Sequence, residues 1–97
     1  MSVELSKKGA TRIRTGEGYT IVRYHDTDIV KFNDSKIILD LGGWLTNSTK
    51  DRMNLTSQEY DLGYAVYSKK KVGYVEYQGE VVEIEEDKPL TLRRRKS

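Results

Sequence analysis

The chain has 97 residues, which is enough for one small domain and too few for two domains that each bury a core. It contains no cysteine, so disulfides, thiolate metal sites and a cysteine nucleophile are excluded. The 17 Lys and Arg residues stand against 15 Asp and Glu residues, and this balance is too even to identify a nucleic-acid-binding protein by bulk charge.

The opening residues Met1 to Lys8 lack the apolar segment of a signal peptide. No stretch of the chain approaches the ~20 apolar residues that span a bilayer. We therefore expect no membrane partner. We expect a single domain over residues 1–97, with flexible ends at 1–9 and 93–97.

From Thr11 onward, short runs of β-branched and aromatic residues alternate with turn residues, a pattern typical of antiparallel strands. Short polar and glycine clusters between these runs predict the turns. The pattern predicts a meander of four N-terminal strands, at residues 11–14, 19–24, 29–32 and 36–41. The predicted turns are 16–18, 25–28 and 33–35.

The strand-like alternation of residues stops after residues 42–44. The segment 45–60 lacks this alternation, and we expect it to form one short helix. Residues 48–51 resemble a capping box with Ser48 as the N-cap and Asp in place of the usual Glu. Met53 and Tyr60 fall on one helical face, which we expect to pack on a sheet.

A second β section follows the helix, with a basic hairpin tip at residues 68–71 and a charged break at 85–89. Its predicted strands are 64–67, 72–77, 80–84 and 90–92. The fold class expected from the whole chain is α+β: a mostly antiparallel, twisted β-sheet with one short helix packed on one face.

The first candidate site is the corner between the N-terminal strands and the helix. Gly42 and Gly43 permit a close backbone approach, and a helix N-terminus favours an anion. Lys50 and Arg52 lie where they could complete a phosphate site, although the spacing of a P-loop is missing. The alternative is purely structural: the glycines make a corner, Trp44 fills the core, and the cations are solvated.

The second candidate is the set of cations near the tyrosines of the second β section. Basic loops beside exposed aromatic side chains on a sheet are typical of single-stranded nucleic-acid binding. The alternative assigns the tyrosines to the core and the basic tail to a solvated, disordered end. The candidate residues are Lys69, Lys70, Lys71, Arg93, Arg94, Arg95, Tyr64 and Tyr67.

His25, with Asp26 and Asp28, is the third candidate, because imidazole and carboxylates can bind a metal ion or share a proton. No second His lies at ligand spacing, so polar turn chemistry is the favoured interpretation. We expect no metal, no cofactor and no catalytic residue, and hence no enzyme.

Three segments in a fixed order carry a resemblance: His25 to Val30, the Gly-Gly-Trp corner at 42–44, and the Thr-Lys-x-Arg-x-Asn segment at 49–54. Their combined spacing is far more specific than any one of them. The chain resembles a group of small uncharacterised bacteriophage proteins. This resemblance implies a viral setting, and we expect the protein to act in the cytoplasm of the infected host cell.

The sequence therefore predicts a non-enzymatic phage-type accessory protein that binds nucleic acid through Lys50, Arg52 and the two basic clusters. The alternative is a protein-directed inhibitor or modulator of a host protein, such as a defence or transcription component, that binds through Tyr64 and Tyr67.

Overall fold

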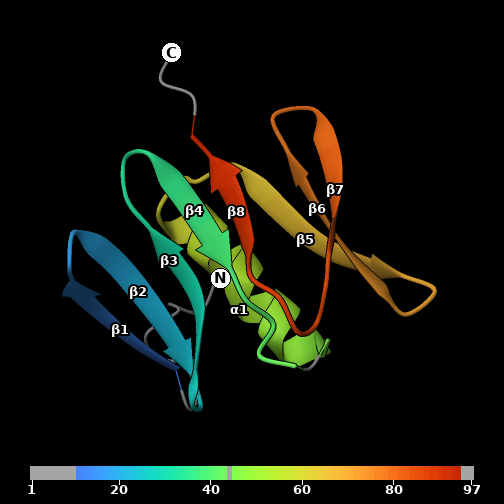
Figure 1. Cartoon of the computed structure of the whole chain (residues 1–97), viewed down its shortest axis with the longest axis horizontal. Coiled ribbons are helices and arrows are strands. Elements are labelled where there is room, and N and C mark those ends of the chain that lie inside the picture. The colour runs from blue at the N-terminus through green and yellow to red at the C-terminus, as the bar shows by residue number, and fades with distance from the viewer. Residues whose placement is uncertain (1–10, 44, 95–97) are drawn as a thin grey trace.

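The computed structural model describes residues 11–43 and 45–94, which form two antiparallel sheets and one helix (Figure 1). The five-stranded sheet has the order β1-β2-β3-β4-β8, with β1 (Thr11–Gly16), β2 (Tyr19–Tyr24), β3 (Thr27–Phe32), β4 (Lys36–Leu39) and β8 (Leu90–Arg93). The three-stranded sheet has the order β5-β6-β7, with β5 (Tyr64–Lys69), β6 (Val72–Tyr77) and β7 (Glu80–Ile84). With the helix α1 (Asn47–Glu59), these strands confirm the predicted α+β class, although the strands divide into two sheets.

Two-residue turns with positive φ join most of the paired strands. Glu17 and Gly18 have φ of 55° and 82°, and Gln78 and Gly79 have φ of 51° and 81°. Such turns match the right-handed twist of a hairpin. Strand pairing also extends into three predicted turns, because Gly16 pairs with Tyr19, Thr27 pairs with Tyr24 and Lys69 pairs with Val72.

The helix begins two residues earlier than its predicted N-cap implies. Thr46 is the N-cap, with an extended backbone (φ −118°, ψ 157°), and its Oγ1 accepts a hydrogen bond from Thr49 N at 3.2 Å. Ser48 therefore lies in the first turn of α1, and the predicted capping box is wrong.

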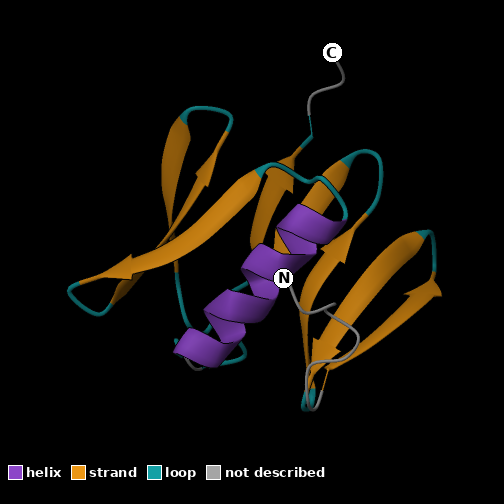
Figure 2. Ribbon diagram, turned by 180° about the vertical axis from the view of Figure 1, so that it is seen from behind, coloured by secondary structure: helices purple, strands orange, loops and turns teal. Residues whose placement is uncertain are grey.

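The helix lies against the five-stranded sheet and alongside β5, an edge strand of the three-stranded sheet (Figure 2). Met53 is fully buried, and the core around it draws on both sheets, including Val22, Val30, Ile37, Leu39, Val66, Val75 and Ile84. Tyr60 lies at the edge of this core, 37 % exposed, with its ring 5.0 Å from that of Phe32. The prediction that Trp44 fills the core concerns a position outside the described residues.

Side chains of α1 also bond the backbone at the free edge of β5. Ser57 Oγ donates to Tyr64 O at 2.7 Å and accepts from Tyr64 N at 3.0 Å. Asn54 makes the equivalent pair of bonds with Val66. The helix thereby satisfies edge groups that would otherwise lack partners.

Two residues of the predicted flexible ends, Arg93 and Arg94, are described by the structure, whereas residues 1–9 and 95–97 lie outside the described residues. Arg93 belongs to β8 and pairs with Lys36 of β4. The backbone N–H of Arg94 donates to Ser35 O at 2.9 Å, and its Nη1 donates to Asn33 O at 2.8 Å. These bonds give partners to backbone groups of Arg93 and Arg94.

Candidate functional site

The face of the five-stranded sheet that points away from α1 is strongly basic. Ile13 pairs with Val22 on the core side, so Arg12 and Arg14 point to the opposite side. The same alternation across the other strands adds further cations. We call this surface the basic face; its cations are Arg12, Arg14, Arg23, Lys31, Lys36 and Arg93.

Little negative charge opposes these cations. Asp28 is the one acidic strand residue that the register places on the basic face among the described residues. It pairs with Arg14, with Nη2 and Oδ2 3.2 Å apart. Because the net charge of the whole chain is only +2, the fold concentrates positive charge here that the overall balance conceals.

One aromatic side chain, Tyr19, stands among these cations. The Nζ atoms of Lys31 and Lys36 lie 5.3 Å and 5.7 Å from the centre of its ring. Ile21 lies next to it on the same face, only 5 % exposed and flanked in register by Arg14 and Lys31. The long stems of these cations thus cover an apolar side chain while their charges remain outside.

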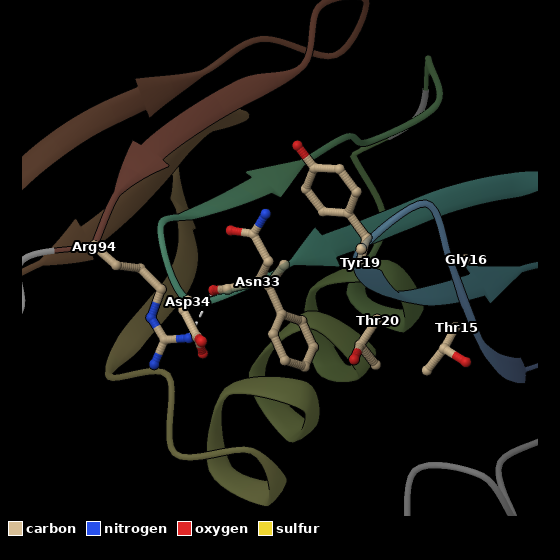
Figure 3. Close-up of a pocket in the computed structure, with 9 residues that line it drawn as sticks. Thr15, Gly16, Tyr19, Thr20, Asn33, Asp34 and Arg94 are labelled. Atoms are coloured by element: carbon tan, nitrogen blue, oxygen red, sulfur yellow. Dashed lines mark hydrogen bonds between the residues drawn. The ribbon is translucent and has the colours of Figure 1, made fainter.

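A cavity of ≈ 510 Å³ adjoins Tyr19 at the end of the sheet where the β1–β2 and β3–β4 turns meet Arg94 (Figure 3). Figure 3 shows Arg94 and Asp34 on one side of the cavity and Thr15 and Gly16 on the other, with the ring of Tyr19 pointing away from Thr15 and Thr20. Its walls therefore combine an aromatic ring with hydroxyl, amide, carboxylate and guanidinium groups.

The structure gives partners to both predicted cations of the helix. Lys50 Nζ donates to Ser68 Oγ at 2.5 Å. Arg52 Nε donates to Thr11 Oγ1 at 2.9 Å, and the guanidinium lies 4.0 Å from the centre of the Tyr24 ring. Cations near a helix N-terminus work against the helix dipole, and these contacts are the structural gain that offsets that cost.

Lys50 and Arg52 share a groove of ≈ 710 Å³ with Tyr67 and Ser68 of β5. Ser68 directly precedes Lys69, Lys70 and Lys71, which are exposed at the β5–β6 tip. The predicted residues therefore form two separate groups. Lys50, Arg52 and Tyr67 lie near the hairpin tip. Arg93 lies on the basic face, Arg94 lines the cavity at the end of the sheet, and Arg95 lies outside the described residues.

The prediction that Tyr64 contacts a partner is wrong, because its side chain is buried. It is 5 % exposed, and its hydroxyl donates to Met53 O at 2.6 Å. Burial raises the pKa of the Tyr64 phenol far above its ordinary range. Tyr67, by contrast, is 39 % exposed and stacks on Tyr74, with ring centres 5.6 Å apart.

Most of the basic face was missed by the sequence analysis. Arg12, Arg14, Arg23, Lys31 and Lys36 occur singly in apolar strands rather than as a run, so they do not form a charged cluster in the sequence. The available signal was alternation: Arg12 and Arg14, then Tyr19, Ile21 and Arg23, are each two residues apart.

The described residues offer neither a metal site nor a membrane-spanning helix. Within residues 11–43 and 45–94, no group of three or more His, Asp or Glu side chains is placed to hold a metal ion. Within the same residues, no helix has the length and apolar character needed to cross a membrane.

Comparison with known families gives a match over almost the whole chain. The model of the family described as Kyanoviridae Gp96 protein matches residues 3–91. This is a bacteriophage family, in agreement with the expected resemblance to small phage proteins. The particular Gly-Gly-Trp and Thr-Lys-x-Arg-x-Asn pattern stays a prediction. Neither the curated proteins nor the solved structures gave a match.

Proposed function

The chain belongs to the Kyanoviridae Gp96 protein family of bacteriophages, and we propose that it is a non-enzymatic accessory protein that binds nucleic acid in the cytoplasm of the infected host cell. The observation that supports this proposal is the basic face. Six cations from five adjacent strands share one surface, and a single strand carboxylate opposes them.

Such a surface suits a polyanion better than a small ligand. The strand backbones at the registered pairs Arg12 with Arg23 and Lys36 with Arg93 lie about 5 Å apart, and Arg12 and Arg14 are about 7 Å apart along β1, so the cations form a two-dimensional array. Phosphate groups that bind to it release condensed counterions, which provides affinity without sequence readout. Four of the six cations are arginines, whose planar guanidinium can contact a phosphate through two N–H groups.

Fluorescence anisotropy with labelled oligonucleotides, single-stranded and duplex, over a range of salt concentrations tests the proposal. We expect affinity to fall steeply as salt rises. The double variant Arg12→Ser, Arg93→Ser removes two exposed cations of the basic face and should make the slope of log affinity against log salt shallower by about 0.7 to 0.9 per lost contact. Asp28→Asn should tighten binding, because it removes the opposing carboxylate.

Two matched variants locate the interface. Lys88→Ser removes an exposed cation of the β7–β8 connection and should leave binding unchanged. Lys69→Ser with Lys71→Ser tests the hairpin tip. Loss of binding in the hairpin variant alone would move the interface away from the basic face, and the absence of any salt-dependent binding would overturn the proposal.

A protein-directed role is the second candidate, because one apolar surface is exposed elsewhere. The stacked pair Tyr67 and Tyr74 lies on the outer face of the three-stranded sheet, where Val81 of β7 is 55 % exposed. Exposed aromatic residues are common anchors of protein interfaces. Capture of a host protein that resists salt and is lost in Tyr67→Ala would favour a modulator of a host protein over a nucleic-acid-binding protein.

A further inference from the structure

We infer that the ligand of the basic face is single-stranded nucleic acid, with one unpaired base stacked on Tyr19. This inference rests on the proposed nucleic-acid function and adds the strandedness of the ligand and the residue that selects it. It is carried by the position of Tyr19, whose ring lies on the basic face with the ammonium groups of Lys31 and Lys36 5.3 Å and 5.7 Å from its centre.

A duplex cannot use this aromatic ring. Its bases are stacked on one another and present only their edges in the grooves, whereas an unpaired base can offer its flat face to a tyrosine. A surface that bound duplex phosphates alone would need only cations. The half-buried ring of Tyr19 beside Lys31 and Lys36 is therefore a feature that only an unpaired base can exploit.

The two lysines beside the ring fit the same ligand. In the free protein, the ammonium groups of Lys31 and Lys36 lie within cation–π range of Tyr19. Lysine carries its charge on a flexible stem, so both groups can swing toward the phosphates on either side of a base that takes their place over the ring. Stacking and phosphate contacts would then come from one cluster of three side chains.

The test compares a short oligothymidylate with a duplex of the same length, in the wild type and in two variants of Tyr19. Tyr19→Leu removes the aromatic face and keeps an apolar side chain, whereas Tyr19→Phe keeps the ring. We expect the wild type to prefer the single strand. Tyr19→Leu should weaken single-strand binding by roughly 5- to 150-fold, the effect of losing one stacked base, while Tyr19→Phe stays close to wild type.

Duplex binding serves as the internal control, because it depends on the cations and not on stacking. Unchanged duplex affinity in Tyr19→Leu would show that the basic face is still folded. Equal affinity for the two ligands, or a Tyr19→Leu variant with normal single-strand binding, would overturn this inference and leave the nucleic-acid function standing. Binding of neither ligand would overturn both.

Discussion

Asn54 of α1 bonds both backbone groups of Val66 of β5: its Nδ2 donates to Val66 O at 2.9 Å, and its Oδ1 accepts from Val66 N at 2.7 Å. One amide side chain thus occupies the position that a neighbouring strand would take. With the equivalent bonds between Ser57 and Tyr64, it joins the helix to the three-stranded sheet by direct backbone recognition.

Asn54→Ala should destabilise the fold by about 1 to 3 kcal/mol, because it leaves two partly buried backbone groups without partners. Urea unfolding measures the loss. Gln58→Ala, at an exposed position of the same helix, is the matched control and should change stability by less than about 0.5 kcal/mol. Similar stability of the two variants would show that water replaces Asn54 at the edge of β5.

Gly42→Ala should cost more stability than Gly43→Ala. Both glycines have positive φ, 66° and 91°, which costs a non-glycine residue about 1 to 2 kcal/mol. Only at Gly42 would the new Cβ also meet a neighbour, with Thr27 Oγ1 2.5 Å away. Thermal unfolding of the two variants compares them directly. Adding Thr27→Ala to Gly42→Ala should recover part of the extra stability that Gly42→Ala loses relative to Gly43→Ala. If none of this stability is recovered, the loss comes from backbone strain alone.

The β5–β6 turn should become more stable when its two lysines are replaced. Lys70 and Lys71 have φ of 52° and 66°, where Asn followed by Gly is the preferred pair. Lys70→Asn with Lys71→Gly should therefore raise stability by about 1 to 2 kcal/mol. The same protein in the anisotropy assay shows whether these strained lysines contribute to binding. Lower stability would mean that the lysines make contacts in the fold that outweigh the strain.

Tyr64 should make the protein sensitive to alkaline pH. Its phenol stays protonated in the folded state, whereas in the unfolded chain it ionises above about pH 10. Stability from this group is thus complete below about pH 10 and falls by up to about 1.4 kcal/mol per pH unit above it. Tyr64→Phe should lose about 0.5 to 1.5 kcal/mol at neutral pH, because the bond to Met53 O is removed, and should show a weaker alkaline decline.

Urea unfolding at a series of pH values checks this prediction, with Tyr67→Phe as the control for an exposed tyrosine. The control should decline with pH as the wild type does. A Tyr64→Phe protein whose alkaline decline equals that of the wild type would contradict the assignment and attribute the decline to other groups.

The strands were largely predictable because their turns have local signatures. Strands 72–77 and 80–84 were predicted with the bounds of β6 and β7, since Gln78 and Gly79 mark the hairpin between them. The N-cap of α1 could not be predicted, because Thr46 and Ser48 both carry a hydroxyl that can cap a helix. Only the position of the Thr49 N–H, which donates to Thr46, decides between them.

Which side of a strand faces the core was harder to predict. Tyr64 and Tyr67 are equally aromatic, and alternation shows only that they point in opposite directions. Burial of Tyr64 depends on the helix that covers it, a tertiary contact. The basic face was hidden for the same reason, since it forms only when five strands align in register.

The pairing of β8 with β4 has a consequence for how the chain folds. β1 to β4 and β5 to β7 are each built from neighbouring hairpins, whereas the pair Leu39 and Leu90 encloses the helix and the whole three-stranded sheet. Closing so long a loop costs entropy that no local contact offsets. We therefore expect the last strand to dock late, after the segments it encloses have formed. Arg93 would thus join the other cations of the basic face only at the end of folding.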